Sequence, residues 1–207
     1  MTYLITEEVF LFLAGAVFGA LVCAWIAAWR SRVVRRRYAK KVRVLREEAT
    51  ADALTGLGNQ RNYLEVSSKL WGCVPPDDQA IVVMDVNGLK MVNDTLGHSM
   101  GNKLLQEMAS IAQEAFCPYG MVFRVGGDEF VALLNCSEME LEEAVGSLRQ
   151  QVFQVCNVGF WTVGLAIGAA HRQEFPEVPP KKLLTTADER MYEDKHRWHE
   201  RQDALDR

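Results

Sequence analysis

Two carboxylates lie beside a pair of glycines in an otherwise apolar stretch of the sequence. In MVFRVGGDEFVALL (121–134), Gly126 and Gly127 precede Asp128 and Glu129, and apolar residues flank both sides. The pattern predicts a β-hairpin whose tip carries the glycines, which tolerate a positive φ and let a ligand approach the backbone. Carboxylates at such a tip could bind a divalent metal, although a plain surface hairpin would show the same pattern.

A further carboxylate favours the metal interpretation. Asp85 follows the apolar run 80–84, which predicts a buried strand, and ligands bind near strand ends in α/β sheets. If the hairpin pairs with this strand, Asp85 and Asp128 can reach one site, and two hard oxygen ligands suit Mg²⁺. Lys90 is then placed to neutralise negative charge in phosphoryl or nucleotidyl transfer. The sequence has no GxxxxGK[ST] loop, so backbone amides after Asp85 would hold the phosphates.

The hydrophobic periodicity predicts an α+β fold, with helices packed on one sheet that includes the hairpin. The predicted elements are helix 60–70, strand 80–84, a short helix after the Asn87-Gly88 turn, helix 100–116, the hairpin, helix 137–156, strand 160–170 and helix 182–201.

Three separated motifs resemble the GGDEF family of diguanylate cyclases. They are DALTGLGNQR (52–61), DVNGLKMVNDTLGHSMGN (85–102) and RVGGDEF (124–130), and the resemblance extends over about 50–201. It implies a palm-like, nucleotide-cyclase-like sheet and the synthesis of cyclic di-GMP from two GTP molecules across a homodimer. It also implies Mg²⁺ as the cofactor, with Mn²⁺ as an alternative.

The resemblance implies roles for individual residues. The implied metal ligands are Asp85, the Val86 carbonyl and Asp128, and the implied catalytic residues are Asp128, Glu129 and Lys90. The implied substrate-binding residues are Leu89, Asn93, His98, Asn102, Gly126, Gly127 and Lys195, the last in ADERMYEDK (187–195). Asn93 and His98 would also suit a turn-capping role.

The sequence departs from the family pattern at several positions. Asn102 stands where the family has an aspartate that binds guanine, and an amide offers only one acceptor. His199 replaces an arginine that would neutralise the triphosphate, unless Arg197 substitutes for it. Two alternatives to a GTP-specific cyclase follow: a weak or inactive module that binds nucleotide or a protein partner, and a cyclase with relaxed base selectivity. Because Cys117 and Gly120 replace the family's RxxD motif, product feedback at that site is not expected.

Residues 9–29 form an uncharged run of 21 residues, long enough for one transmembrane helix. Basic residues follow the run, which places residues 1–8 outside and the rest in the cytoplasm by the positive-inside rule. A cleaved signal peptide is the alternative, but it requires a basic region before a shorter run. Residues 30–51 predict a basic linker helix, 52–201 the GGDEF domain and 202–207 a tail. Gly15 and Gly19 form a GxxxG motif through which two copies could pair.

The charge distribution argues against nucleic acid as a partner. The formal net charge is -4, and residues 52–207 contain fourteen Lys and Arg against twenty-three Asp and Glu. The basic residues cluster after the apolar run, where anionic lipid is the nearest partner. The predicted protein is therefore a cytoplasmic-membrane protein that binds GTP and forms a homodimer.

Overall fold

The computed structural model of the protein describes residues 50–71, 77–156, 163–175 and 180–205, with six positions between 25 and 35. The chain divides into two compact units, 1–49 and 50–207. Most of the predicted membrane span 9–29 and of the linker 30–51 lies outside the described residues. None of the helices formed by the described residues combines the length and hydropathy that a bilayer crossing requires.

The second unit consists of one sheet and the helices that cover it. Its elements are β1 (Gly58–Asn59), α2 (Gln60–Trp71), β2 (Gln79–Asn87), α3 (Leu89–Leu96), α4 (His98–Phe116), β3 (Gly120–Arg124), β4 (Glu129–Asn135), α5 (Glu138–Cys156), β5 (Gly164–His171), a 3-10 turn (Arg172–Glu174) and α6 (Pro180–Leu205).

The sheet has the strand order β1-β3-β4-β2-β5. β2 lies between β4 and β5 and is antiparallel to both, and all nine of its residues are buried. A continuous apolar run is what a strand covered on both faces requires. The strand continues two residues past Asp85, which is therefore not its last residue, to Asn87.

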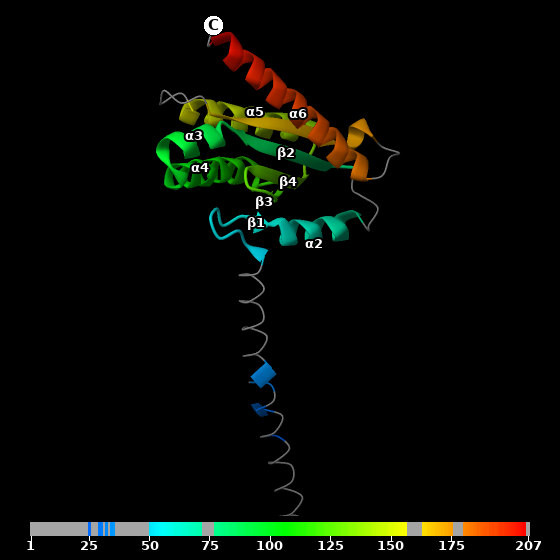
Figure 1. Ribbon diagram of the computed structural model, residues 1–207. Helices are drawn as coiled ribbons and strands as arrows, with labels where there is room; N and C mark the ends of the chain where they lie inside the picture. The colour runs from blue at the N-terminus through cyan, green and yellow to red at the C-terminus, as the bar shows by residue number, and fades with distance from the viewer. Residues whose placement is uncertain are drawn as a thin grey trace, which may run out of the picture. The chain divides into compact units, whose positions relative to one another are not determined.

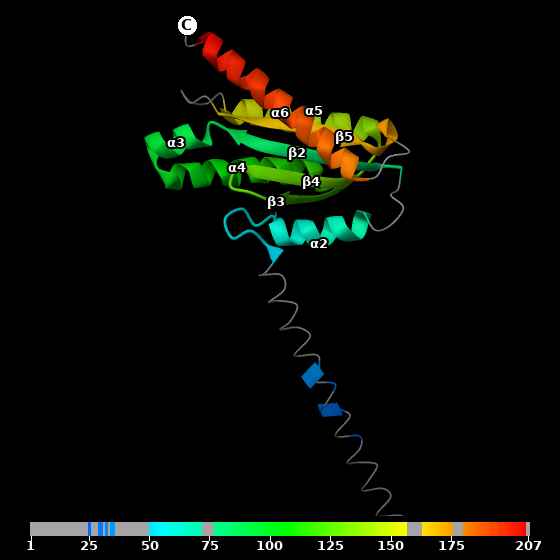
Figure 2. The same cartoon turned by 45° about the vertical axis from the view of Figure 1, so that its right-hand side comes forward.

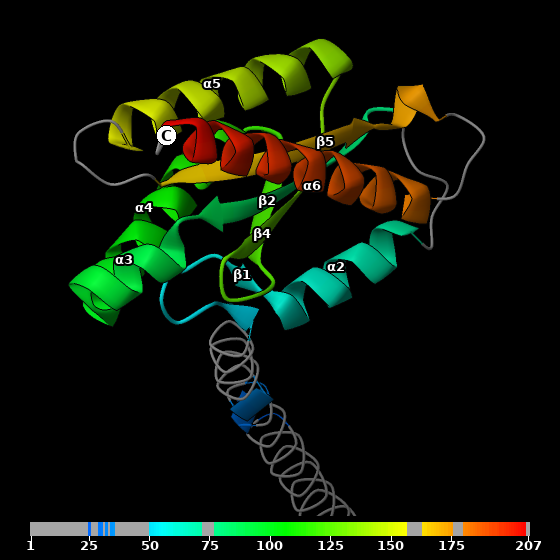
Figure 3. The same ribbon diagram turned by 45° about the horizontal axis from the view of Figure 1, so that its top comes forward.

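The two faces of the sheet have separate apolar cores. α4 and α5 cover one face, with Phe116 and Leu148 almost fully buried beneath them. α2 and α6 cover the other face, where Phe123 and Leu183 are buried. Figures 1 and 3 show α6 crossing the sheet on the side of α2, and α5 on the opposite side. The predicted α+β sheet with helices packed on it is thus confirmed.

Local sequence explains the element boundaries. Gly88 has a φ of 80° and ends β2 by turning the chain into α3. Figure 2 shows the β2 arrow leading into α3. Gly97, with a φ of 83°, separates α3 from α4 in the same way. Ser137 and Glu140 cap α5 reciprocally: Glu140 Oε2 accepts from the Ser137 amide at 2.8 Å, and Ser137 Oγ accepts from the Glu140 amide at 3.3 Å.

Two elements differ from the sequence prediction. β1, for which the sequence analysis predicted no element, pairs in parallel with β3, and Gly58 leaves room for the Phe123 ring, since a Cβ there would lie 2.5 Å from it. α6 extends from Pro180 to Leu205, beyond both predicted ends, 182 and 201. The predicted strand 160–170 begins at Gly164, and residues 160–162 lie outside the described residues.

Candidate active site

The hairpin brings the two predicted metal-binding acids to one place. β3 and β4 pair antiparallel, and Asp85 on β2 faces Glu129 on β4. The Val86 amide donates to the Asp128 carbonyl at 3.0 Å, which fixes the hairpin turn against the end of β2. Val86 and Asp128 both line a cavity of about 670 Å³. The structure therefore juxtaposes Asp85, Val86 and Asp128, and their role as metal ligands stays a prediction.

The glycines of the hairpin tip act differently from the expectation. Neither Gly126 nor Gly127 has a positive φ, so backbone conformation does not require glycine at either position. A Cβ on Gly126 would lie 2.5 Å from the carboxylate of Glu129, whereas nothing lies within 4 Å of a Cβ on Gly127. A side chain at position 126 would therefore require the exposed Glu129 carboxylate to shift. Neither glycine lines the cavity, and Glu129 is exposed at the start of β4.

Arg124 holds the hairpin turn in place. Its Nη2 and Nε donate to the Gly127 carbonyl at 2.7 and 3.3 Å, and its Nη1 donates to Asp52 Oδ1 at 3.0 Å. Burial acts to raise the pKa of Asp52, but hydrogen bonds from Thr55 and Arg124 lower it below its usual value overall. One guanidinium thus connects the 52–61 motif to the glycine turn, a positioning role that the sequence analysis missed. The signal for this role in the sequence was Arg124 itself, a charged residue in an otherwise apolar predicted strand.

Asp85 is a buried carboxylate that is ion-paired with a lysine. It is 5% exposed, and the Lys195 Nζ lies 2.8 Å from its Oδ1. This contact is an ion pair without hydrogen-bond geometry, because Oδ1 has no hydrogen-bond partner among the described residues. Lys195 pairs here with Asp85, and its predicted contact with phosphates stays a prediction.

The surroundings of Asp85 fit a hard cation. A buried carboxylate oxygen without a hydrogen bond is costly unless a cation or ligand completes its shell. No group of three or more His, Cys, Asp or Glu side chains gathers anywhere in the part of the chain that the structure describes. The site therefore offers two carboxylates and a backbone carbonyl, a donor set that suits Mg²⁺ because that ion keeps several waters.

Asp194 fixes the helix that carries Lys195. Its Oδ2 accepts from the Ile167 amide of edge strand β5 at 3.0 Å and from Arg149 of α5 at 2.8 Å. Arg197 also turns towards this group, with its Nη2 3.4 Å from Asp194 Oδ1. Arg197 is absent from the cavity lining, whereas His199 is present, and the substitution of Arg197 for the missing arginine stays a prediction.

Lys90 and Leu89 line the cavity from the first turn of α3, where backbone N–H groups have no partner within the helix. The sequence analysis missed two further groups of residues that line the cavity. The first group follows Asp85 at strand spacing or Lys195 at helix spacing, and consists of Asn87, Trp198 and Gln202. The second group lies on one side of α3 and consists of Met91, Asp94 and Thr95. The periods of strand and helix could have identified the first three.

Three of the residues predicted to bind the substrate lie at a different corner. Asn93 is on α3, and His98 and Asn102 begin α4, none of them in the cavity lining. The Asn93 side chain lies against Gly101, where an added Cβ would overlap it. α3 and α4 start after glycines and have no side-chain capping bond, so the turn-capping interpretation of Asn93 and His98 gains no support.

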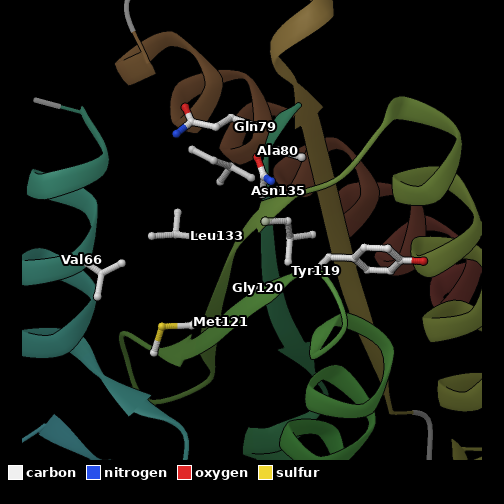
Figure 4. Close-up of a pocket in the computed structure, with 10 residues that line it drawn as sticks. Val66, Gln79, Ala80, Tyr119, Gly120, Met121, Leu133 and Asn135 are labelled. Atoms are coloured by element: carbon white, nitrogen blue, oxygen red, sulfur yellow. The ribbon is translucent and has the colours of Figure 1, made fainter. Parts of the chain in front are cut away.

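A second cavity, of about 340 Å³, lies at the opposite end of the strands. In Figure 4, Val66 of α2 faces Leu133 and Met121, while the Tyr119 ring points away from α2. Gly120 lies in its wall, and a Cβ there would overlap the Leu133 carbonyl. Position 120 therefore has no room for the aspartate of the RxxD motif, which supports the expectation that product feedback does not act there.

The domain is thus a mixed five-stranded sheet with a cavity of about 670 Å³ at one end of its strands, and Asp128, Lys90 and Lys195 line this cavity. Residues 49–201 match the family model described as "Diguanylate cyclase, GGDEF domain". The probable diguanylate cyclase DgcI of Escherichia coli is 33% identical over 158 residues, which cover 75% of this chain and 33% of DgcI. The chain thus spans about a third of the length of that relative.

Solved structures share the fold. Diguanylate cyclase SiaD of Pseudomonas aeruginosa, in complex with its activator SiaC, superimposes with a TM-score of 0.72 at 24% identity, covering 93% of this chain and 75% of SiaD. The coiled coil and GGDEF domain of DgcB from Caulobacter crescentus, in complex with c-di-GMP, gives 0.68 at 21% identity, covering 84% and 93%. The chain belongs to the GGDEF family of diguanylate cyclases, which are nucleotidyltransferases.

Proposed function

We propose that the protein condenses two molecules of GTP into cyclic di-GMP and two pyrophosphates, in a Mg²⁺-dependent reaction across a homodimer. The observation that carries this proposal is the cavity that Asp128, Lys90 and Lys195 line, with buried Asp85 ion-paired to Lys195 beside it. Membership of the family supports the choice of reaction.

Different residues of the site would bind the metal and the phosphates. Asp85, the Val86 carbonyl and Asp128 would hold Mg²⁺, or Mn²⁺ as an alternative, which lowers the pKa of the attacking 3′-hydroxyl when bound. The free N–H groups at the start of α3, with Lys90, would bind the phosphates and neutralise the charge that develops on them. Lys195 would exchange its ion pair with Asp85 for a contact with the terminal phosphates.

Each protomer would hold one GTP, so a second copy must supply the other half of the reaction. We assign the pairing to the predicted membrane span and linker, 9–51, because the span contains the GxxxG motif. The Caulobacter crescentus DgcB structure contains a coiled coil together with the GGDEF domain, which supports a helical linker here. The same segment would anchor the protein in the cytoplasmic membrane with the cyclase domain in the cytoplasm.

Asn102 and His199 favour a second candidate function. An amide at 102 weakens the discrimination for guanine, and His199 gives less neutralisation of a triphosphate at neutral pH than arginine would. Both changes fit a module that binds nucleotide or a protein partner without turnover, or a cyclase that also accepts ATP.

Product analysis of the purified dimer distinguishes these functions. The full chain in detergent, with the dimer verified by light scattering, would be incubated with Mg²⁺ and GTP, ATP or both, and the products separated by chromatography. Cyclic di-GMP from GTP alone is expected. A mixed or adenine product would indicate relaxed selectivity. Absence of any cyclic dinucleotide from a verified dimer would overturn the cyclase proposal and leave the binding module.

A further inference from the structure

Asn87 is a buried amide without a hydrogen bond. It is the last residue of β2 and is 2% exposed, yet neither its Oδ1 nor its Nδ2 has a partner among the described residues. Most buried polar side chains in native proteins are hydrogen-bonded, so such a group calls for an explanation. Asn87 also lines the larger cavity, where a ligand could supply the missing partners.

The position of Asn87 on the strand sets its neighbours. Side chains two residues apart on a strand point to the same side, so Asn87 and Asp85 face the same way. Asp85 Oδ1 likewise has no hydrogen-bond partner within the described part of the chain. Among the described residues, Asn87 therefore has no hydrogen-bond partner, and Asp85, on the same side of the strand, has the ion pair with Lys195 but no hydrogen bond to its Oδ1.

Residues of α6 enclose this group from the other side. Lys195, Trp198, His199 and Gln202 line the same cavity at helical spacing. The strand partner of Asn87 is Gly164, and a Cβ on Gly164 would lie 2.9 Å from the Trp198 indole nitrogen. Gly164 thus leaves room for the Trp198 indole, which lines the same cavity as Asn87.

We propose that Asn87 is a ligand-positioning residue whose amide hydrogen-bonds the polyphosphate of the bound nucleotide. This inference rests on the proposed function, because it takes a nucleoside triphosphate as the ligand. Nδ2 donates to a phosphate oxygen, and Oδ1 accepts from a water of the ligand's hydration shell. A phosphate is the chemistry that the surroundings select, because Lys90, Lys195 and the first turn of α3 present donors and positive charge to the same space.

A neutral amide suits this position better than a carboxylate. Asp94 and Asp128 already line the cavity with carboxylates, and Asp85 is ion-paired with Lys195 in its wall. A further carboxylate would repel a phosphate and would not donate to it, whereas an amide donates without added charge. The side-chain chemistry at 87 therefore separates a role towards phosphate from a role towards the metal.

The test compares Asn87→Leu with the wild-type full chain in detergent. The probes are a non-hydrolysable GTP analogue and inorganic tripolyphosphate, each with Mg²⁺. Leucine has a similar size and no polar atoms, so the thermal midpoint without ligand is expected to rise by about 2 °C or more as the unpaired amide is removed. The dissociation constants for both probes are expected to rise by about tenfold, because a hydrogen bond to a charged group is lost.

Two further variants make the result specific. Tyr63→Phe is a control that also removes a buried polar atom, the Tyr63 hydroxyl, which has no hydrogen-bond partner among the described residues. Tyr63 lies on α2, and its ring contacts Phe123 in the apolar core on that face of the sheet. The Tyr63→Phe variant should also raise the midpoint but leave both dissociation constants unchanged. Asn87→Asp should weaken binding more than leucine does, because a carboxylate repels the phosphate.

The outcomes separate this inference from the proposed function. Equal binding of both probes by wild type and Asn87→Leu would overturn the role of Asn87 and leave the cyclase proposal intact. Tighter Mg²⁺-dependent binding by Asn87→Asp would overturn the phosphate assignment, since the side chain would then act towards the metal. A lower midpoint for Asn87→Leu, with unchanged affinity, would show a role in folding instead. Tripolyphosphate binding that depends on Asn87, in a chain that makes no cyclic dinucleotide, would uphold the inference and overturn the cyclase proposal. Failure of wild type to bind either probe would overturn both.

Discussion

Both ends of the central strands bury polar side chains, but these side chains have hydrogen-bond partners among the described residues at one end and lack them at the other. At one end, Asp85 Oδ1 and the Asn87 amide have no hydrogen-bond partner among the described residues. At the other end, His171 is 1% exposed, and both ring nitrogens have partners: Nε2 lies 2.8 Å from the Cys136 carbonyl, and Nδ1 accepts from the Gln173 amide at 3.2 Å. These contacts assign the proton to Nε2, because only that nitrogen faces an acceptor.

The difference indicates which end requires a ligand. The His171 end is complete within the chain, and burial, with Glu140 and Asp78 nearby, raises the pKa of the Cys136 thiol to about 11, so that the thiol stays neutral. The Asp85 end is incomplete, and a cation and a phosphate would supply its partners. Changes at the Asp85 end should therefore alter ligand binding and turnover, and changes at the His171 end should alter stability alone.

The largest effect is expected from Asp128→Ala. Loss of a carboxylate ligand removes several kcal/mol of stabilisation from the metal-dependent step, so cyclic di-GMP formation should fall by about 1000-fold or more. The melting temperature should change little, because the side chain is only half-buried in a turn. Glu114→Ala, which removes an exposed carboxylate from α4, is the matched control and should retain activity. Unchanged turnover in Asp128→Ala would refute the metal assignment.

The opposite behaviour is expected from His171→Leu. The substitution leaves the Cys136 carbonyl and the Gln173 amide without their partner, which should cost about 2 kcal/mol of unfolding free energy. Turnover per folded molecule should stay within about twofold, since binding at the far end of the strands is intact. Urea titration and product assays on the same sample measure both quantities. His171→Gln, which can still donate and accept hydrogen bonds, should recover part of the stability. A loss of turnover in His171→Leu without a loss of stability would contradict the expectation that this end affects stability alone.

Sequence patterns predicted the fold and the meeting of the two acids well, because both depend on periodicity and strand pairing. The apolar run before Asp85 specified a buried strand, and the hairpin signal placed Asp128 beside it. β1 escaped prediction because two residues carry no periodic signal, and its pairing depends on the fit of Gly58 against Phe123.

The side-chain contacts of the site could not be predicted in the same way. Lys195 pairs with Asp85 because Asp194 fixes α6 against β5 and α5, contacts between residues far apart in the sequence. The absence of partners at Asn87 likewise depends on every neighbour in three dimensions. Sequence spacing indicates which residues share a face, whereas hydrogen-bond satisfaction is a property of the packed structure.

A smaller effect is expected from Asn102→Asp, at the α3–α4 corner. A carboxylate provides two acceptors for the guanine edge, so the ratio of GTP to ATP turnover should rise by about tenfold. The Mg²⁺ concentration for half-maximal activity should not change, because position 102 lies outside the cavity at the Asp85 end. Ser99→Asp adds the same charge to the same turn of α4 and serves as the control. An unchanged ratio in Asn102→Asp would remove this assignment of base recognition.

The smallest effect concerns pH dependence at the His171 end. Arg190 donates to Glu174, with its Nη1 3.0 Å from Oε1. Hydrogen bonding from Arg190 is the main cause that lowers the pKa of Glu174 below its usual value of 4.5, although burial partly opposes it. Because the folded pKa is lower than the unfolded one, the stabilisation is fully present above about pH 5 and is lost as the pH falls through the folded pKa. In Glu174→Gln, the unfolding free energy lost between neutral and acidic pH should therefore be smaller by about 0.5 kcal/mol, the size typical of partly exposed pairs. Arg190 also donates to the Ala169 carbonyl of β5, a contact that the glutamine variant retains, so the neutral-pH fold should persist. Urea titrations of both proteins between pH 3 and 7 measure the difference, and parallel curves would show that this ion pair does not contribute to the acid sensitivity of that end.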